Sequence, residues 1–154
     1  MDRIQQNLLI AKAVSMRGNC ARRKTGCVIT DRRGHILSTG YNGVAPNVVH
    51  CDIERCPGVG YPSGEGLDKC QAIHAEQNAL LQCTELHRAR TLYSVTGICM
   101  TCIKLLAVTP IVDIYYIEQY AHDYDAFAYW TEIMDRRMVQ IELEYSIVER
   151  EARL

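Results

Sequence analysis

Four residues in the middle of the chain have the types and spacing of a metal-dependent hydrolytic centre. His74 and Glu76 lie two positions apart, and Cys99 and Cys102 follow as a C-x-x-C pair. One imidazole and two thiolates leave the fourth position of a tetrahedral Zn²⁺ open for water, which is typical of a catalytic zinc. Zinc lowers the pKa of bound water, so hydroxide is available near neutral pH. A carboxylate beside the metal that need not bind it is suited to moving protons.

The placement of these residues strengthens the interpretation, because H-x-E alone is common and C-x-x-C alone is only moderate evidence for a metal site. His74 and Glu76 fall early in one expected helix, and Cys99 and Cys102 fall early in the next, with a strand between them. Two helix N-termini can then meet at one edge of a sheet, where their partial positive charge favours thiolate over thiol. The alternative is a buried histidine with two small apolar cysteines, which leaves the shared placement without a reason. We therefore favour the zinc site.

Hydrophobic periodicity predicts the elements that must position these residues. The order of elements is α-β-β-α-β-α-β-α-β, which predicts one α/β domain over residues 1–154 with a five-stranded mixed sheet and helices on both faces. A turn is expected at 31–34, and Asp125 is the expected N-cap of the last helix. The expected helices cover 2–17, 72–83, 99–108 and 126–134, and the expected strands cover 27–30, 36–39, 91–94, 111–117 and 139–143.

Composition narrows the class of protein. The chain has 154 residues, 48% of them hydrophobic, which suits one globular domain with an ordinary core. A net charge of -1 gives no strong basic field for nucleic acid. No apolar run approaches the roughly 18 residues of a membrane helix, and Asp2, Arg3 and Lys12 interrupt any secretory segment. We expect a cytoplasmic protein that binds neither nucleic acid nor membrane.

Residues 44–71 form an insertion without hydrophobic periodicity, containing three of the four prolines and four of the ten glycines. So long a segment needs a function or a staple. Without a secretory signal, cysteines favour metal binding or burial over disulfides. Cys27 and Cys83 are expected in the core, whereas four thiolates fit a closed structural zinc that would hold the insertion together. His50 could replace one thiolate, and the alternative is that some of the thiols are merely buried. The four thiols concerned are Cys20, Cys51, Cys56 and Cys70.

Together these motifs resemble the zinc cytidine-deaminase superfamily and, within it, the deoxycytidylate (dCMP) deaminase branch. The resemblance runs from about Leu8 to Leu143 and implies a three-layer α/β/α cytidine-deaminase-like fold. The Gly-Tyr-Asn-Gly loop separates this branch from tRNA adenosine deaminases and free-cytidine deaminases. The resemblance rests on Cys20-Ala21-Arg22, Gly26-Cys27-Val28-Ile29, Thr39-Gly40-Tyr41-Asn42-Gly43, His50-Cys51, Cys70, His74-Ala75-Glu76-Gln77-Asn78-Ala79 and Cys99-Met100-Thr101-Cys102.

The resemblance also implies a reaction. His74, Cys99 and Cys102 would hold the catalytic Zn²⁺. Zinc-bound hydroxide would convert dCMP to dUMP and ammonia, with Glu76 shuttling protons to N3 and to the leaving amine. Members of the branch with this cysteine pattern resemble two-zinc enzymes.

Substrate contacts are carried over in the same way. The resemblance implies that Asn42 contacts the sugar and that Tyr120 lies beside the pocket. Arg22 and Lys24 are candidates for the nucleotide phosphate, and the resemblance supports Arg22 more than Lys24. The alternative is that the run from Arg22 to Lys24 is a solvated basic face.

The branch further implies regulation and assembly. Its members are often homo-hexamers that dCTP activates and dTTP inhibits, with Mg²⁺ accompanying the triphosphate. The effector site would involve the loop formed by Gly40, Tyr41, Asn42 and Gly43.

One position departs from the branch, and other functions stay open. Ile98 stands where the family usually has proline before the first cysteine, and proline there would preset the first helical turn. Alternatives to dCMP deamination are a bifunctional dCMP/dCTP deaminase or another cytosine nucleoside or nucleotide deaminase. A non-enzymatic alternative is a zinc-stabilised binding module, but such a module has no use for Glu76. The tail at 144–154 has no assigned role.

Overall fold

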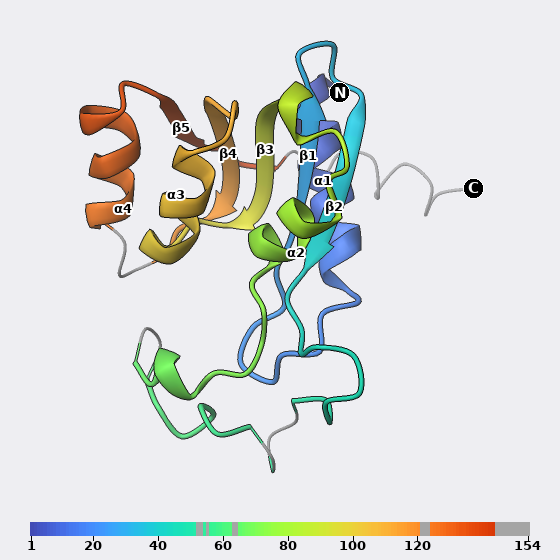
Figure 1. Ribbon diagram of the computed structural model, residues 1–154, viewed down its shortest axis with the longest axis vertical. Coiled ribbons are helices and arrows are strands. Elements are labelled where there is room, and N and C mark those ends of the chain that lie inside the picture. Colours follow the sequence, from blue (N-terminus) through green and yellow to red (C-terminus); the bar gives the residue numbers. More distant parts are fainter. Residues whose placement is uncertain (52–53, 55, 63–64, 121–123, 144–154) are drawn as a thin grey trace, which may run out of the picture.

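A five-stranded mixed sheet forms the middle layer of the protein (Figure 1). The computed structural model describes residues 1–51, 54, 56–62, 65–120 and 124–143; the tail at 144–154 lies outside the described residues. The strand order is β2-β1-β3-β4-β5, with β1 antiparallel to β2 and β3, and with β3, β4 and β5 parallel. The strands are β1 (Gly26–Asp31), β2 (Ile36–Tyr41), β3 (Ala89–Thr96), β4 (Asp113–Glu118) and β5 (Arg137–Gln140).

Helices cover both faces of this sheet, which confirms the predicted three-layer α/β fold. In Figure 1, α1 lies behind β1 and β2, whereas α2 and α3 lie in front of the sheet. No helix among the described residues is both long and apolar enough to cross a membrane. The helices are α1 (Arg3–Ser15), α2 (Ala75–Gln82), α3 (Met100–Ala107) and α4 (Tyr124–Ala128), which continues into the π-helical turn Tyr129–Ile133, and the 3₁₀ turns are Leu67–Lys69 and Leu86–Arg88.

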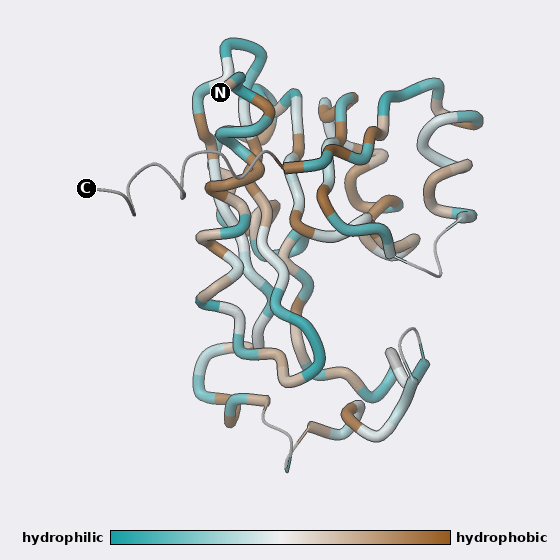
Figure 2. The backbone as a smooth tube through the Cα atoms, turned by 180° about the vertical axis from the view of Figure 1, so that it is seen from behind, coloured by the Kyte–Doolittle hydropathy of each residue, from teal (hydrophilic) through white to brown (hydrophobic). Residues whose placement is uncertain are grey.

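Alternation along the central strands divides the core into two parts. Cys27 and Ile29 point to the face covered by α2 and α3, and Val28 points to the face covered by α1. Every residue of β1 is buried, since the strand lies between two others and under helices on both sides. Figure 2 shows that the β1–β2 turn, at the top of that view, is mostly hydrophilic. The central strands are therefore the rigid base from which the loops at the other end of the sheet project.

The two helices that carry the candidate ligands begin later than predicted. Gly43 and Ile73 form an isolated antiparallel bridge, so the backbone stays extended up to His74, which is the N-cap of α2. Cys99 is likewise the extended N-cap of α3. The candidate ligands thus lie at the N-terminal ends of the two helices.

Two other boundaries were predicted wrongly. Asp125 lies in the first turn of α4 rather than at its N-cap. The last strand covers 137–140 rather than 139–143, because its pairing with β4 runs from Asp113 opposite Arg137 to Tyr116 opposite Gln140. The buried alternation continues past the strand into the segment near Leu143. Alternation reports which side chains are buried and does not by itself locate backbone pairing.

Ile98 lies outside α3, so its contribution is packing rather than the shape of the first helical turn. Its side chain is 2% exposed and belongs to the core between the sheet and α3. We expect Ile98→Ala to lower the free energy of unfolding by about 2–5 kcal/mol, because it leaves a cavity in that core. Urea unfolding measures this, with Leu105→Ala, an exposed position on α3, as the matched control. Equal effects of the two substitutions would contradict the packing role.

Candidate metal centre and active-site cavity

His74, the N-cap of α2, is fixed by contacts within the first turn of the helix and between the helix and β2. The His74 backbone N–H donates to the Gln77 side chain at 2.9 Å, and Asn78 Nδ2 donates to the Tyr41 carbonyl at 2.8 Å. A Cβ at Gly40 would lie 2.1 Å from the Ala75 carbonyl oxygen. Only glycine therefore allows β2 and α2 to approach this closely.

The second pair of candidate ligands comes from the start of α3. Cys99 caps the helix, and its carbonyl accepts from the Ile103 N–H at 2.9 Å. Cys102 lies one turn later with its side chain completely buried. Because residues three apart on a helix share a face, both thiols point towards the start of α2.

The three candidate ligands meet at one point. His74 Nδ1 lies 3.4 Å from Cys99 Sγ and 3.4 Å from Cys102 Sγ, and the three atoms all lie within 4.8 Å of one another. With Zn–S and Zn–N distances of about 2.3 and 2.0–2.1 Å, a tetrahedral zinc separates nitrogen and sulfur by about 3.5 Å. The residues therefore fit Zn²⁺ without rearrangement.

Glu76 lies beside this centre and is buried. Its side chain is 5% exposed, and burial raises the pKa of its carboxyl. Oε2 accepts from the Cys102 thiol at 3.4 Å, and Oε1 accepts from Ser94 Oγ at 3.4 Å. The sequence motifs did not point to Ser94, which is completely buried on β3. Burial disfavours the charged form of the carboxyl and so favours its holding a proton more than an exposed glutamate does.

A cavity of about 420 Å³ opens over the metal centre. His74, Glu76 and Cys99 line this cavity. Arg23 lines it as well, and its guanidinium lies 5.8 Å from the centre of the Tyr120 ring. The insertion contributes to the lining as well. The lining residues are Cys20, Arg22, Arg23, Thr25, Asn42, Val59, Tyr61, Cys70, Ala72, His74, Glu76, Thr96, Gly97, Cys99 and Tyr120.

The substrate-contact candidates are placed differently from one another. Asn42 and Tyr120 line the cavity. The Asn42 side chain already accepts from the Thr25 N–H at 2.9 Å and donates to the Arg23 carbonyl at 2.7 Å. Lys24 is exposed and is not among the lining residues.

Both arginines beside Lys24 reach the cavity, but with different surroundings. The Arg22 guanidinium donates to carbonyls of the insertion, whereas Arg23 faces the Tyr120 ring. Arg23 was missed as a candidate, and the only sequence signal for it was its place in the basic run.

The Gly-Tyr-Asn-Gly loop sends only one of its residues into the cavity. Asn42 lines it, whereas Gly40 packs against α2 and Gly43 pairs with Ile73. The Tyr41 ring lies 5.4 Å from the Arg17 guanidinium. The effector role of this loop stays a prediction.

Comparison with known proteins places the chain in a family. Residues 1–118 match the cytidine and deoxycytidylate deaminase zinc-binding region. The chain belongs to this family. The family match and the geometry of the three ligands together support Zn²⁺ as the metal of this centre.

Relatives named deoxycytidylate deaminase confirm the predicted branch. The Saccharomyces cerevisiae protein is 33% identical over 120 residues, which are 77% of this chain and 38% of the yeast protein. The Mycobacterium phage D29 protein is 37% identical over 115 residues, covering 70% of this chain and 88% of the phage protein. The matched part of this chain thus covers well under half the length of the yeast relative.

A solved structure shares the fold. The dCMP deaminase from the cyanophage S-TIM5, in complex with dCMP and dUMP, superposes with a TM-score of 0.70 at 23% identity. The match covers 89% of this chain and 95% of the phage chain. At this identity the likeness shows the fold alone.

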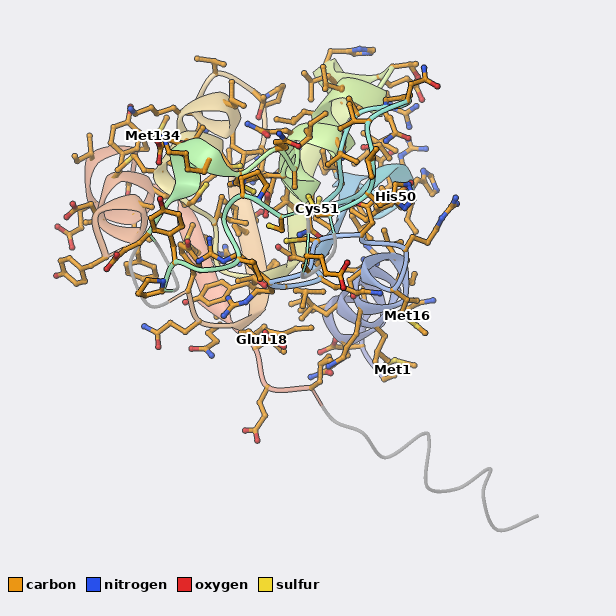
Figure 3. All side chains as sticks on the ribbon, turned by 90° about the horizontal axis from the view of Figure 1, so that it is seen from below. Met1, Met16, His50, Cys51, Glu118 and Met134 are labelled. Carbon is orange, nitrogen blue, oxygen red and sulfur yellow. The ribbon has the colours of Figure 1, made fainter. Side chains whose placement is uncertain are left out.

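Four further thiols of this zinc-binding family member gather near the insertion. Burial raises the pKa of the Cys51 thiol, and the neighbouring Cys56, Cys20 and Cys70 thiols raise it further. Figure 3 views this end of the molecule, with Cys51 near the centre and exposed His50 nearer the edge. Among the described residues, the only three or more candidate ligand atoms within 4.8 Å of one another belong to His74, Cys99 and Cys102. Cys27 and Cys83, by contrast, are buried in the core as predicted.

Zinc binding should release one proton from the thiol pair. A hydrogen bond from Cys102, supported by His74, lowers the pKa of the Cys99 thiol well below its ordinary value. The same hydrogen bond and burial raise the pKa of Cys102. Since Cys102 keeps its proton in the metal-free protein, we expect the zinc dissociation constant to rise about tenfold for each unit fall in pH.

Competition with a chromogenic chelator measures this dependence. Working between about pH 7 and pH 8 keeps the measurement above the ordinary pKa of histidine. Affinity that does not change with pH over this range would mean that both thiols are already ionised without metal.

Proposed function

We propose that this chain hydrolyses dCMP to dUMP and ammonia. The observation that carries the proposal is a three-ligand centre, His74 with Cys99 and Cys102, with buried Glu76 beside it in a cavity. A closed structural zinc site uses four protein ligands, whereas three leave a position for water. The names of the relatives, deoxycytidylate deaminase, support dCMP as the substrate.

Glu76 is the residue that moves protons. His74, Cys99 and Cys102 would hold Zn²⁺, which would supply a Lewis acid that lowers the pKa of water. The Glu76 carboxylate takes a proton from the attacking water and delivers it to N3 of the cytosine, then takes the remaining proton of the added hydroxyl and delivers it to the amine, which leaves as ammonia. Its burial supports this role because a raised pKa lets the carboxyl alternate between the two protonation states.

Binding groups lie along the same cavity. We assign the phosphate to Arg23, because its guanidinium lines the cavity and makes no hydrogen bond or ion pair with any residue in the described part of the chain. Asn42 keeps one amide N–H and one oxygen lone pair for the sugar after its two backbone contacts. Tyr120 completes the wall beside Arg23.

The proposal extends to a second metal, assembly and regulation. Cys20, Cys51, Cys56 and Cys70 would hold a structural Zn²⁺, which the electrostatic effect of the other three thiols on Cys51 supports. The resemblance to the dCMP branch supports a homo-hexamer activated by dCTP and inhibited by dTTP, with Mg²⁺ accompanying the triphosphate.

Ultraviolet-monitored deamination of a nucleotide panel tests the proposal. The panel contains dCMP, CMP, dCTP, deoxycytidine and cytidine, with dCTP or dTTP and Mg²⁺ added to the dCMP reaction. We expect turnover of dCMP above all, raised by dCTP and lowered by dTTP. Turnover of dCTP itself would indicate a bifunctional deaminase. Zinc-loaded protein that is silent across the panel would overturn the proposal.

A further inference from the structure

The insertion forms part of the wall of the active-site cavity. Val59 and Tyr61 line the cavity, although the backbone hydrogen bonds around both residues belong to short turns. The Val59 N–H donates to Cys56 and the Tyr61 N–H to Gly58. Turns of this kind do not tie a segment to the sheet, so another contact must place these side chains.

Arg22 supplies that contact. Its Nη2 donates to the Pro62 carbonyl at 2.6 Å and to the Tyr61 carbonyl at 3.3 Å, and its Nη1 donates to the Glu65 carbonyl at 3.1 Å. Hydrogen bonds from a charged donor are stronger than neutral ones, and the planar guanidinium fixes their directions. Arg22 lies just before β1, so it connects the insertion to the base of the sheet.

The Tyr61 ring is held from a second side. A Cβ at Gly66 would lie 2.5 Å from Tyr61 Cγ, and the Gly66 φ of +63° is a value that favours glycine. Gly66 therefore packs directly beneath the ring. Together, the contacts with Arg22 and Gly66 fix the position of Tyr61 in the cavity wall.

We propose that Arg22 is a positioning residue that docks the insertion over the cavity, and that Tyr61 is thereby a substrate-binding residue. This inference rests on the proposed function and gives the two neighbouring arginines different tasks. Arg23 attracts the phosphate, whereas Arg22 holds the Tyr61 wall against the nucleoside part of the substrate. Aromatic side chains bind through area and stacking, so the contribution of Tyr61 does not depend on the phosphate.

A comparison of dCMP with deoxycytidine separates the two tasks. We expect Arg22→Gln to lower kcat/KM roughly ten- to hundredfold for both substrates by similar factors, mainly through KM. Arg23→Gln should lower kcat/KM for dCMP and leave kcat/KM for deoxycytidine nearly unchanged. Arg22→Lys should not restore activity, because the compact ammonium lacks the two separate nitrogens of the planar guanidinium that reach different carbonyls. Arg32→Gln, a basic residue on the β1–β2 turn, is the matched control.

Two further measurements test the docking itself. Tyr61→Ala should reproduce the Arg22→Gln effect, and the double variant should be little worse than either single variant, because both remove the same wall. Backbone hydrogen exchange at Val59 and Tyr61 should accelerate in Arg22→Gln and stay unchanged in Arg23→Gln. Zinc content is measured in parallel to show that the metal sites are intact.

The outcomes are distinguishable. If Arg22→Gln impairs dCMP but not deoxycytidine, Arg22 binds the phosphate and the inference is wrong. The inference is also wrong if Arg22→Gln changes neither kcat/KM for the two substrates nor the hydrogen exchange at Val59 and Tyr61. Where deoxycytidine turns over too slowly, equilibrium binding of dUMP and deoxyuridine gives the same comparison. Wild-type protein inactive on both substrates would refute the proposed function, while the exchange measurement would still decide whether Arg22 docks the insertion.

Discussion

Glu76→Gln is expected to lower kcat for dCMP by about 10²–10⁴-fold, because the amide cannot take or deliver a proton. The substitution keeps the shape of the side chain, and its carbonyl oxygen can still accept from Ser94 Oγ, the contact that Oε1 makes at 3.4 Å. KM should change much less than kcat, since the loss falls on the chemical step. Steady-state kinetics on zinc-loaded protein measures both parameters.

Zinc content and stability show whether a loss of activity in Glu76→Gln comes from the missing proton transfer or from a lost metal or fold. Metal analysis should give the same stoichiometry in Glu76→Gln as in wild type, and thermal unfolding should be similar. Glu132→Gln, at an exposed position on the π-helical turn after α4, is the matched control and should keep full activity. A Glu76→Gln protein that retains zinc and full turnover would remove the proton-shuttle role and reopen the binding-module alternative.

Cys102→Ala is expected to abolish both zinc binding at the active centre and turnover. It removes one of three ligands and leaves His74 Nδ1 and Cys99 Sγ, which cannot form the tetrahedral site alone. With the proposed second site intact, the zinc content should fall from two ions per chain to one. Inductively coupled plasma analysis after dialysis measures this stoichiometry.

Variants of other cysteines assign the remaining metal. Cys56→Ser should also lower the content to one zinc per chain, through the structural site. Cys83→Ala, at a buried core thiol, should keep both ions. One zinc in wild type, together with normal folding of Cys56→Ser, would exclude the second site and leave the insertion to be held by contacts such as those of Arg22.

The different roles proposed for Arg22 and Arg23 change the interpretation of the basic run before β1. Under the proposal, the two neighbouring arginines have separate roles rather than forming one phosphate site. One reaches three carbonyls of the insertion, and the other lines the cavity beside Tyr120. Charge-conserving substitutions are therefore expected to be tolerated unequally at the two positions.

Local spacing was sufficient to predict the metal centre. His74, Glu76, Cys99 and Cys102 were recognised from residue type and interval, because ligand chemistry and helical geometry act over a few residues. The alternating and periodic apolar patterns likewise predicted the sheet and the helices. Element ends were less accurate, since the Gly43–Ile73 bridge that delays α2 joins residues far apart in the chain.

Only the tertiary structure decided which side chains share the cavity with those ligands. Arg22 and Arg23 are identical in type and adjacent, so no local pattern distinguishes their directions. Tyr61 comes from a segment without periodicity, and its position depends on contacts with Arg22 and Gly66. The sequence by itself thus determined which residues form the candidate metal centre, because a few residues at the right intervals are enough to bring them together. The long-range packing of irregular segments determined the shape of the cavity around it.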